Sequence, residues 1–182
     1  MLQYCRSALM IDWDEIVRRE GPAVWHAIYR LVRNRADADE CFQETFVAAV
    51  SFSNRNVADH WPSLLRRLAI ARAVDRLRRR AHRARYENRV EAVTAVAKQM
   101  DPRQMAETAE LADTLRTAIA KIPPRSAEAF CLHELEGWSY EQIADHLSIS
   151  SGAVGTMLHR ARRRLQTLLT AALQRNKYGN IP

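Results

Sequence analysis

Apolar residues recur at intervals of three and four along most of this chain, a spacing that predicts helices with one buried face each. The pattern is clearest between residues 138 and 165, where it predicts two short helices joined by a tight turn. The first helix would bury Ile143, Ala144 and Leu147. The second would bury four residues spaced by four, three and four positions: Val154, Leu158, Ala161 and Leu165.

Local signals set the ends of these two helices. Ser139 and Gln142 have the spacing of a capping box, and Ser150 is the expected N-cap of the second helix after a turn at Ser148-Ile149. The outer face of the second helix is mostly polar and basic: Thr156, Met157, His159, Arg160, Arg163 and Arg164. This combination predicts a helix-turn-helix that enters a DNA major groove, in preference to an ordinary helical hairpin with a solvated charged face.

The first helix of the chain is expected over residues 12–32, with a break at Gly21-Pro22 because proline fits poorly inside a helix. Its apolar side would carry Ile16, Val24, Ile28 and Leu31. Residues 34–36 would form a connector to the next helix.

The second helix is expected to begin with a capping box of Asp37 and Glu40. Its apolar side would hold Cys41, Phe42, Phe46 and Val50, and its outer side is acidic and polar: Asp39, Glu40, Gln43 and Glu44. Such a cluster can simply balance the helix dipole or can be a docking face, and both interpretations stay open.

A polar loop over residues 51–60 separates this helix from a third one, which starts at Trp61-Pro62 and runs to about Arg80. The expected core residues of the third helix are Leu65, Leu68, Ala69, Ala73 and Leu77. Seven arginines stand here against one acid, Asp75: Arg66, Arg67, Arg72, Arg76, Arg78, Arg79 and Arg80. A solvated charged face is the default for such a run, but this excess favours a nucleic-acid surface.

The rest of the chain predicts a domain boundary followed by further helices. Residues 81–108 have balanced charge and weak periodicity (Val90, Val93, Ala97, Met100), which predicts a partly helical domain boundary interrupted at Asp101-Pro102. A helix over 111–122 and another from Pro123-Pro124 to Gly137, where a left-handed C-cap is expected, would complete a four-helix C-terminal domain. The fold class is therefore all-α, with two small helical domains: 1–80, a linker 81–108, 109–175, and a frayed tail 176–182.

Composition narrows the class of function. The 182 residues carry a formal charge of +7 with a pI near 9.8. Almost all of the positive charge comes from arginine, which suggests a polyanionic partner. No apolar run approaches the roughly 20 residues of a membrane span, and no signal peptide is evident, so we expect a cytoplasmic protein. The cysteines at positions 5, 41 and 131 are odd in number and far apart, which favours reduced, mostly buried thiols.

Catalytic chemistry finds little support. The chain has no phosphate-binding glycine loop, Cys-x-x-Cys motif or nucleophile elbow. Cys131, His133 and Glu134 could suggest a metal site, but a coincidence on one helix face is the better interpretation. We therefore expect no enzyme activity, no cofactor and no metal.

Four stretches, in this order and spacing, resemble the extracytoplasmic-function sigma factors of bacterial RNA polymerase: residues 36–46, 74–80, 122–125 and 135–165. The segments Asp39-Glu-Cys-Phe-Gln-Glu-Thr-Phe46 and Leu158-His-Arg-Ala-Arg-Arg-Arg-Leu165 carry the most specific part of the resemblance. The match spans nearly the whole chain, with the middle linker the least similar part. The resemblance implies a transcription initiation factor that binds core RNA polymerase and directs it to promoters.

The resemblance also implies roles for particular residues. The surface that docks on the polymerase β′ clamp would be formed by Asp39, Glu40, Gln43, Glu44 and Phe46. The part that opens and reads the promoter −10 element as a single strand would comprise Ser53, Asn54, Arg55, Asn56, Arg72, Arg76, Arg79 and Arg80. The reader of the duplex −35 element would present Ser151, Thr156, Met157, His159 and Arg160 to the groove, and Arg162, Arg163 and Arg164 to phosphates. The linker would thread through the polymerase toward the RNA exit path, and the polymerase partners would be the β′ clamp and the β subunit. An anti-sigma factor commonly covers these same surfaces.

The sequence departs from the family pattern at several positions. Ile70-Ala71 stands where an Arg-Asn pair is usual, and Ser148 stands where glycine is common, so a residue with a side chain has to adopt a left-handed conformation there. Gly155 and Met157 replace basic residues, which predicts weaker phosphate anchoring or a different −35 preference. The competing hypothesis is a stand-alone helix-turn-helix regulator that binds a palindromic site as a dimer. The acidic second helix distinguishes the two hypotheses, because only a sigma factor needs a surface that docks on polymerase.

Overall fold

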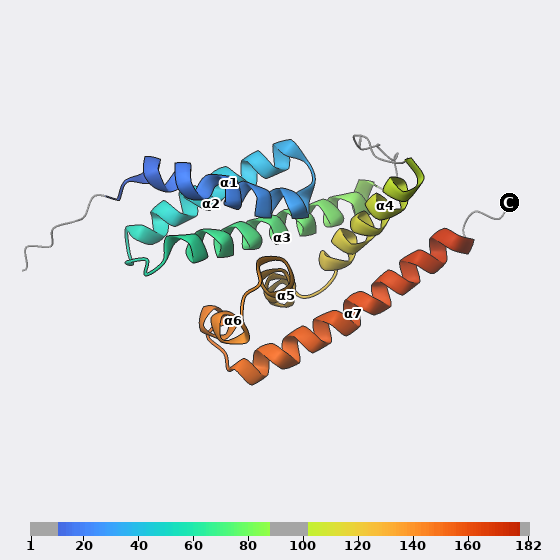
Figure 1. Cartoon of the computed structure of the whole chain (residues 1–182). Helices are drawn as coiled ribbons and strands as arrows, with labels where there is room; N and C mark the ends of the chain where they lie inside the picture. The colour runs from blue at the N-terminus through green and yellow to red at the C-terminus, as the bar shows by residue number, and fades with distance from the viewer. Residues whose placement is uncertain (1–10, 88–101, 179–182) are drawn as a thin grey trace, which may run out of the picture.

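Helices form all the regular structure of the computed structural model in the residues that it describes, which are 11–87 and 102–178, with side chains for 11–84 and 109–174. Within these ranges there are seven helices (Figure 1): α1 Trp13–Val32, α2 Arg35–Ser53, α3 Trp61–Glu87, α4 Pro102–Ile119, α5 Pro124–Glu136, α6 Tyr140–Leu147 and α7 Ser151–Tyr178. The all-α expectation is confirmed.

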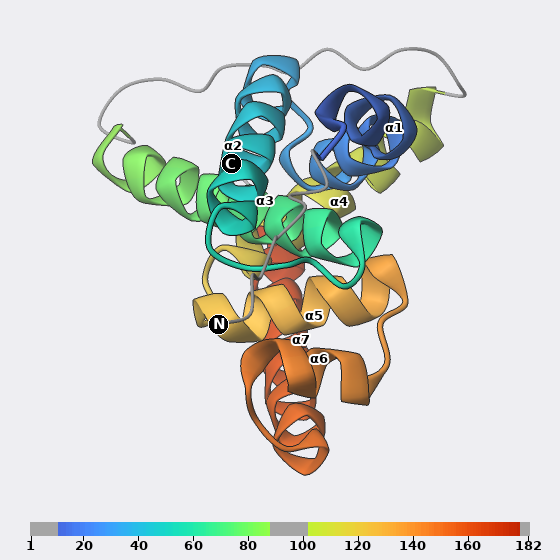
Figure 2. The ribbon, with the colours of Figure 1, turned by 90° about the vertical axis from the view of Figure 1, so that its left-hand side faces the viewer.

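The helices are arranged around α3. Helices α1 and α2 pack on one side of α3, while α5 packs on another side and separates it from α6 and α7 (Figures 1 and 2). Helix α7 contacts α4, α5 and α6. We call α1–α3 the N-terminal half and α4–α7 the C-terminal half. Since α3 contacts both α4 and α5, the two halves are packed together.

One continuous hydrophobic core runs through both halves. Ile28, Leu65 and Ile70 are fully buried in the N-terminal half, and Leu132 and Leu158 are fully buried in the C-terminal half. Full burial of one such side chain contributes about 1.5–3 kcal/mol. The residues that periodicity placed on the buried faces of the first and the last helix are all buried: Ile16, Val24, Ile28, Leu31, Val154, Leu158, Ala161 and Leu165.

The expected break at Gly21-Pro22 is wrong. Helix α1 continues through Pro22, which lies on the exposed side and so costs the helix one backbone hydrogen bond. Gly21 is buried, and a Cβ atom built on it would lie 3.5 Å from the ring of Phe42. Packing of Val24 and Ile16 on either side holds both parts of α1 in one line, because tertiary burial outweighs the local penalty.

The expected cap of the second helix is also wrong. Asn34, which we assigned to a connector, is the N-cap of α2, and its side-chain oxygen accepts a hydrogen bond of 3.0 Å from the backbone N–H of Asp37. Asp37 instead lies inside the first turn, where its carboxylate pairs with Arg76 of α3. Asn and Asp are similarly good caps, so the partner available to Asp37 decides between them.

Several helix ends differ from the expected boundaries. Helix α3 runs to Glu87 and α4 begins at Pro102, so helix enters the segment expected to be a linker from both sides. Pro102 opens a helix instead of interrupting one, because a proline fits the first turn. Helix α7 extends to Tyr178, three residues into the expected tail. The weak helix expected around residues 90–100 lies outside the described residues, as does Cys5.

Candidate nucleic-acid and polymerase interface

The helix-turn-helix is built from α6, a short turn and α7. Ser139 and Gln142 form the expected capping box: Gln142 N donates to Ser139 Oγ at 3.2 Å, and Ser139 N donates to Gln142 Oε1 at 2.9 Å. Ser148 adopts the left-handed conformation with φ of 53°, which turns the chain sharply after α6. Ser150 then caps α7 through a hydrogen bond of 3.2 Å from Ala153 N to its hydroxyl. These contacts fix the angle at which α7 leaves the turn.

The outer face of α7 is open to solvent. Besides Arg162, six of the residues expected to contact duplex DNA there are exposed: Ser151, Thr156, His159, Arg160, Arg163 and Arg164. Met157 is partly buried and packs against the core, so its side chain is only partly available. Gly155 faces the ring of Tyr140, and a Cβ atom there would lie 3.5 Å from it. This face offers guanidinium groups and an imidazole to a polyanion along one side of a helix.

Arg162 has a different role from its neighbours. Its Nε and Nη2 atoms both donate to Glu134 Oε1 of α5, at 3.0 and 2.7 Å. Hydrogen bonding to Glu134, and to Tyr140, raises the pKa of Arg162 above its ordinary value. The ion pair ties α7 to α5, so Arg162 positions the helix in the free protein.

The expected docking face on α2 is exposed and carries two further apolar residues. Asp39, Glu40 and Gln43 are exposed, Glu44 is half-buried, and Phe46 packs partly on the core with its ring 4.9 Å from that of Phe42. Asp39 accepts a hydrogen bond of 3.0 Å from Trp25 Nε1. Val47 is 66% exposed on the same helix, and Val50 is 39% exposed, so its expected place on the buried apolar side is wrong.

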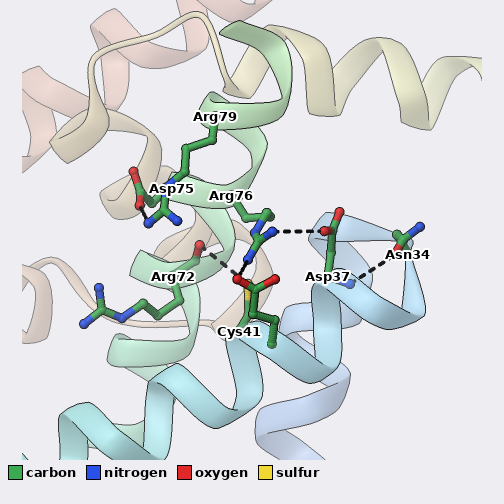
Figure 3. Close-up of polar contacts among 8 residues, drawn as sticks. Asn34, Asp37, Cys41, Arg72, Asp75, Arg76 and Arg79 are labelled. Carbon is green, nitrogen blue, oxygen red and sulfur yellow. Dashed lines mark hydrogen bonds and ion pairs between the residues drawn. The ribbon is translucent and has the colours of Figure 1, made fainter. Parts of the chain in front are cut away.

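Arg76 links the acidic helix to the basic helix. Its Nη1 lies 3.2 Å from Asp37 Oδ1 and its Nη2 lies 2.5 Å from Glu40 Oε1, as the close-up of this cluster shows for Asp37 (Figure 3). The hydrogen bond from Arg76 lowers the pKa of Glu40 below its ordinary value. Arg79 pairs with Asp75 on its own helix. A residue expected to bind DNA therefore holds two carboxylates of α2, one of them in the expected docking set.

The remaining residues expected to contact the single strand lie around the α2–α3 connection and along α3. Asn54, Arg55 and Asn56 are exposed, whereas Ser53 still belongs to α2 and donates its hydroxyl to Val50 O at 2.8 Å. Along α3, Arg80 is exposed and Arg72 is half-buried, with its Nε lacking a hydrogen-bond partner. Val57, at 78% exposure in the loop, is an accessible apolar residue that periodicity had no means to identify.

Two departures from the family pattern have a structural explanation. Ile70 is fully buried in the core, so this position packs between helices and presents nothing to a promoter strand. The left-handed conformation expected of Ser148 is confirmed.

Other chemistry is not apparent in the described part of the chain. No group of three or more metal-ligating side chains is found among the described residues. His133 Nδ1 lies 2.8 Å from Trp138 O, Glu134 pairs with Arg162, and Cys131 is buried. In the same ranges, no helix is both long and apolar enough to cross a membrane.

Comparison with known proteins agrees with this arrangement. The chain matches the family model of sigma-70 region 2 over residues 16–83 and that of sigma-70 region 4 over residues 112–165. It is 34% identical over 168 residues to the ECF RNA polymerase sigma factor SigE of Mycolicibacterium smegmatis, covering 90% of this chain and 63% of that protein. It is 29% identical over 165 residues to the RNA polymerase sigma factor CarQ of Myxococcus xanthus, covering 90% of this chain and 92% of that protein.

Solved structures share the fold. The sigma factor RpoE, in a co-crystal with the anti-sigma factor NepR from Bartonella quintana, superposes with a TM-score of 0.53 at 21% identity, covering 87% of this chain and 97% of that one. CnrH in complex with the cytosolic domain of CnrY gives a TM-score of 0.52 at 26% identity, covering 87% of each chain. The chain belongs to the extracytoplasmic-function sigma factors of the sigma-70 family, which are transcription initiation factors.

Proposed function

We propose that this chain binds core RNA polymerase and directs it to specific promoters, without catalysis of its own. The observation that carries the proposal is the presence in one chain of an exposed acidic face on α2 and a basic outer face on the second helix of a helix-turn-helix. The first is suited to docking on a basic protein surface and the second to duplex DNA. The matches to two sigma-70 regions, in the same order as these two surfaces, support it.

Within this function, we assign the polymerase contact to Asp39, Glu40, Gln43, Glu44 and Phe46, extended by the exposed Val47. We assign −10 single-strand contacts to the loop 54–56 with Arg72, Arg79 and Arg80. We assign −35 duplex contacts to the exposed residues of α7 named above. Arg76 and Arg162 are engaged in ion pairs, so we treat them as positioning residues.

The family resemblance supports two further assignments. We place the protein in the cytoplasm together with its polymerase, and we expect an anti-sigma factor among its partners. The division into a region 2-like domain, a linker and a region 4-like domain is likewise a proposal. A stand-alone dimeric regulator is not favoured by these matches.

Co-elution with bacterial core RNA polymerase on a sizing column tests this function. The wild-type chain should co-elute, and a Gln43→Ala/Glu44→Ala variant should do so at least about fivefold less, because it loses a polar and a charged group that complement the docking partner and speed association. Asp14→Ala/Gln166→Ala, which likewise removes one carboxylate and one amide but at exposed positions on α1 and α7, should behave as wild type. Absence of co-elution, with the chain shifting palindromic duplex DNA as a dimer, would overturn the proposal in favour of the regulator.

A further inference from the structure

Helix α7 has a flank beside α5 and α6 that differs from its outer face. Gly155 and Arg162 are seven residues apart, a spacing that places them on the same side of the helix. Tyr140 of α6 covers this flank, since a Cβ atom built on Gly155 would lie 3.5 Å from its ring and Tyr140 is also a hydrogen-bond partner of Arg162. On the α5 side, the ring centroid of His133 lies 5.2 Å from that of Tyr140. The flank is therefore part of the junction between the three helices.

Arg162 is paired with an acid, unlike the other arginines of the DNA-facing part of α7. Two nitrogens of its guanidinium group donate to one oxygen of Glu134, at 3.0 and 2.7 Å. Arg160, Arg163 and Arg164 are exposed and have no carboxylate partner within the described residues. The side chains of Arg162 and Glu134 are 43% and 38% exposed, so the pair lies at the edge of the surface that would meet DNA.

An arginine that is already paired adds little to the electrostatic part of duplex binding. A phosphate contact strengthens binding because the cation neutralises the phosphate and releases counterions that were condensed on the DNA. If Arg162 keeps its partner Glu134, it neutralises no phosphate. If Arg162 turns to a phosphate instead, the carboxylate of Glu134 is left unpaired beside the DNA and repels it. In both cases the charges of the pair sum to zero, so the pair is close to equivalent to no contact.

We propose that Glu134 is a specificity-determining residue for duplex DNA: it cancels the charge of Arg162, so that the flank of α7 beside α5 adds no phosphate contact. Phosphate contacts carry no sequence information, whereas hydroxyl groups such as those of Ser151 and Thr156 on α7 can bind base edges. An acid that limits the first kind of contact leaves a larger share of the affinity to the second kind. The inference deepens the duplex-binding role of α7 and rests on that proposed function.

The salt dependence of binding to a fluorescent duplex of mixed sequence measures this cancellation. The slope of log K against log salt reports the number of neutralised phosphates, and it requires no knowledge of the promoter. Fluorescence anisotropy with the full chain, between about 50 and about 200 mM salt, gives the slope for each variant. The substituted residues are all exposed, so the variants should keep the fold of the wild-type chain.

Glu134→Gln should steepen the slope by about 0.9, the value of one phosphate contact, so that its affinity falls about 3.5-fold further than that of the wild type over this range. Asp145→Asn is the matched control, because it removes one negative charge from an exposed position on α6 that pairs with no arginine of the described residues. It should leave the slope close to that of the wild type, since salt screens charges that are not in contact. Equal slopes in Glu134→Gln and Asp145→Asn would overturn the proposal.

Two further variants separate this inference from the proposed function. Arg160→Gln removes an arginine without a carboxylate partner and should make the slope shallower by about 0.9, whereas the Glu134→Gln/Arg162→Gln double variant should keep the slope of the wild type. A double variant as shallow as Arg160→Gln would show that Arg162 binds a phosphate despite Glu134, and would overturn the inference alone. An unchanged slope in both Arg160→Gln and Arg163→Gln would mean that the duplex binds away from α7, which would overturn the duplex-binding role and the inference with it.

Discussion

At the scale of single residues, backbone conformation and side-chain partners explain departures from the family pattern. Ser148 occupies a left-handed position with φ of 53°, where a Cβ atom is unfavourable by roughly 1–2 kcal/mol. The turn keeps this geometry because Ser148 N donates to Asp145 O and Ile149 N donates to Ala144 O, at 3.3 and 3.0 Å. The strain is therefore maintained by contacts around the turn.

Replacing Ser148 with glycine should stabilise the protein by about 0.5–1 kcal/mol, because relief of the left-handed penalty exceeds the extra entropy of glycine in the unfolded chain. For a chain of this size, this corresponds to a rise in melting temperature of roughly 2 °C. Thermal unfolding followed by circular dichroism measures it. Ser148→Ala, which keeps the Cβ atom, is the control and should give no such rise; a glycine variant no more stable than wild type would contradict the argument.

At the scale of helices, the acidic face of α2 and the basic face of α3 are not independent surfaces. Arg76 of α3 contacts Asp37 and Glu40 of α2, so its guanidinium, a planar group with several donors, positions α2 against α3. A carboxyl group whose pKa is lowered on folding adds stability above its unfolded pKa, and this stability is lost as the pH falls through the folded value. For Glu40, that window lies below its ordinary value of 4.5.

Arg76→Gln should therefore raise the pKa of Glu40 toward its ordinary value, since the hydrogen bond from Arg76 is the largest cause of the shift. Carboxyl carbon chemical shifts followed by NMR between pH 2 and about 7 measure this titration. Arg79→Gln is the matched control, because Arg79 acts on Glu40 only through a smaller charge effect. If both variants gave the same Glu40 titration, Arg76 would not be the residue that holds the acidic face.

At the scale of the whole molecule, one core and a set of arginine contacts join the two halves. The pKa of Cys131 depends on both halves. Burial on α5 raises it to about 12, and charges from both halves act on the thiol. A thiol whose pKa is higher in the folded state than in the unfolded state retains its proton longer when folded. The associated stability is complete below pH 9, the unfolded value, and is lost as the pH rises toward about 12.

The free energy of unfolding should accordingly decrease between pH 9 and pH 10.5 more steeply in the wild-type chain than in Cys131→Ala. The expected difference approaches roughly 1.4 kcal/mol for each pH unit in this window. Urea unfolding at a series of pH values measures both slopes, and comparison of slopes removes the constant cost of the cavity that alanine leaves. Cys41→Ala should show a smaller change of slope, because Arg76 partly opposes the rise in the pKa of Cys41; parallel slopes for all three chains would contradict the prediction.

The sequence by itself determined the helices whose ends and faces are set locally. The capping box of Ser139 and Gln142, the left-handed Gly137, and the buried row from Val154 to Leu165 all follow from residue type and spacing over one or two helical turns. The segments that resemble a sigma factor could likewise be recognised from the sequence, because the residues of each motif are contiguous along α2 and α7.

Only the tertiary structure decided between residues of equal local preference. Asn34 caps α2 because Asp37 has a partner in Arg76, and α1 stays continuous because its neighbours bury both sides of Pro22. The arginines of α3 are one residue type in sequence, yet Arg76 faces α2, Arg66 faces Glu136 and Arg78 holds Ile122 O. Periodicity fixes which face of a helix is buried, but the long-range partner of an exposed charge depends on which helix packs beside it, and this contact exists only in the folded molecule.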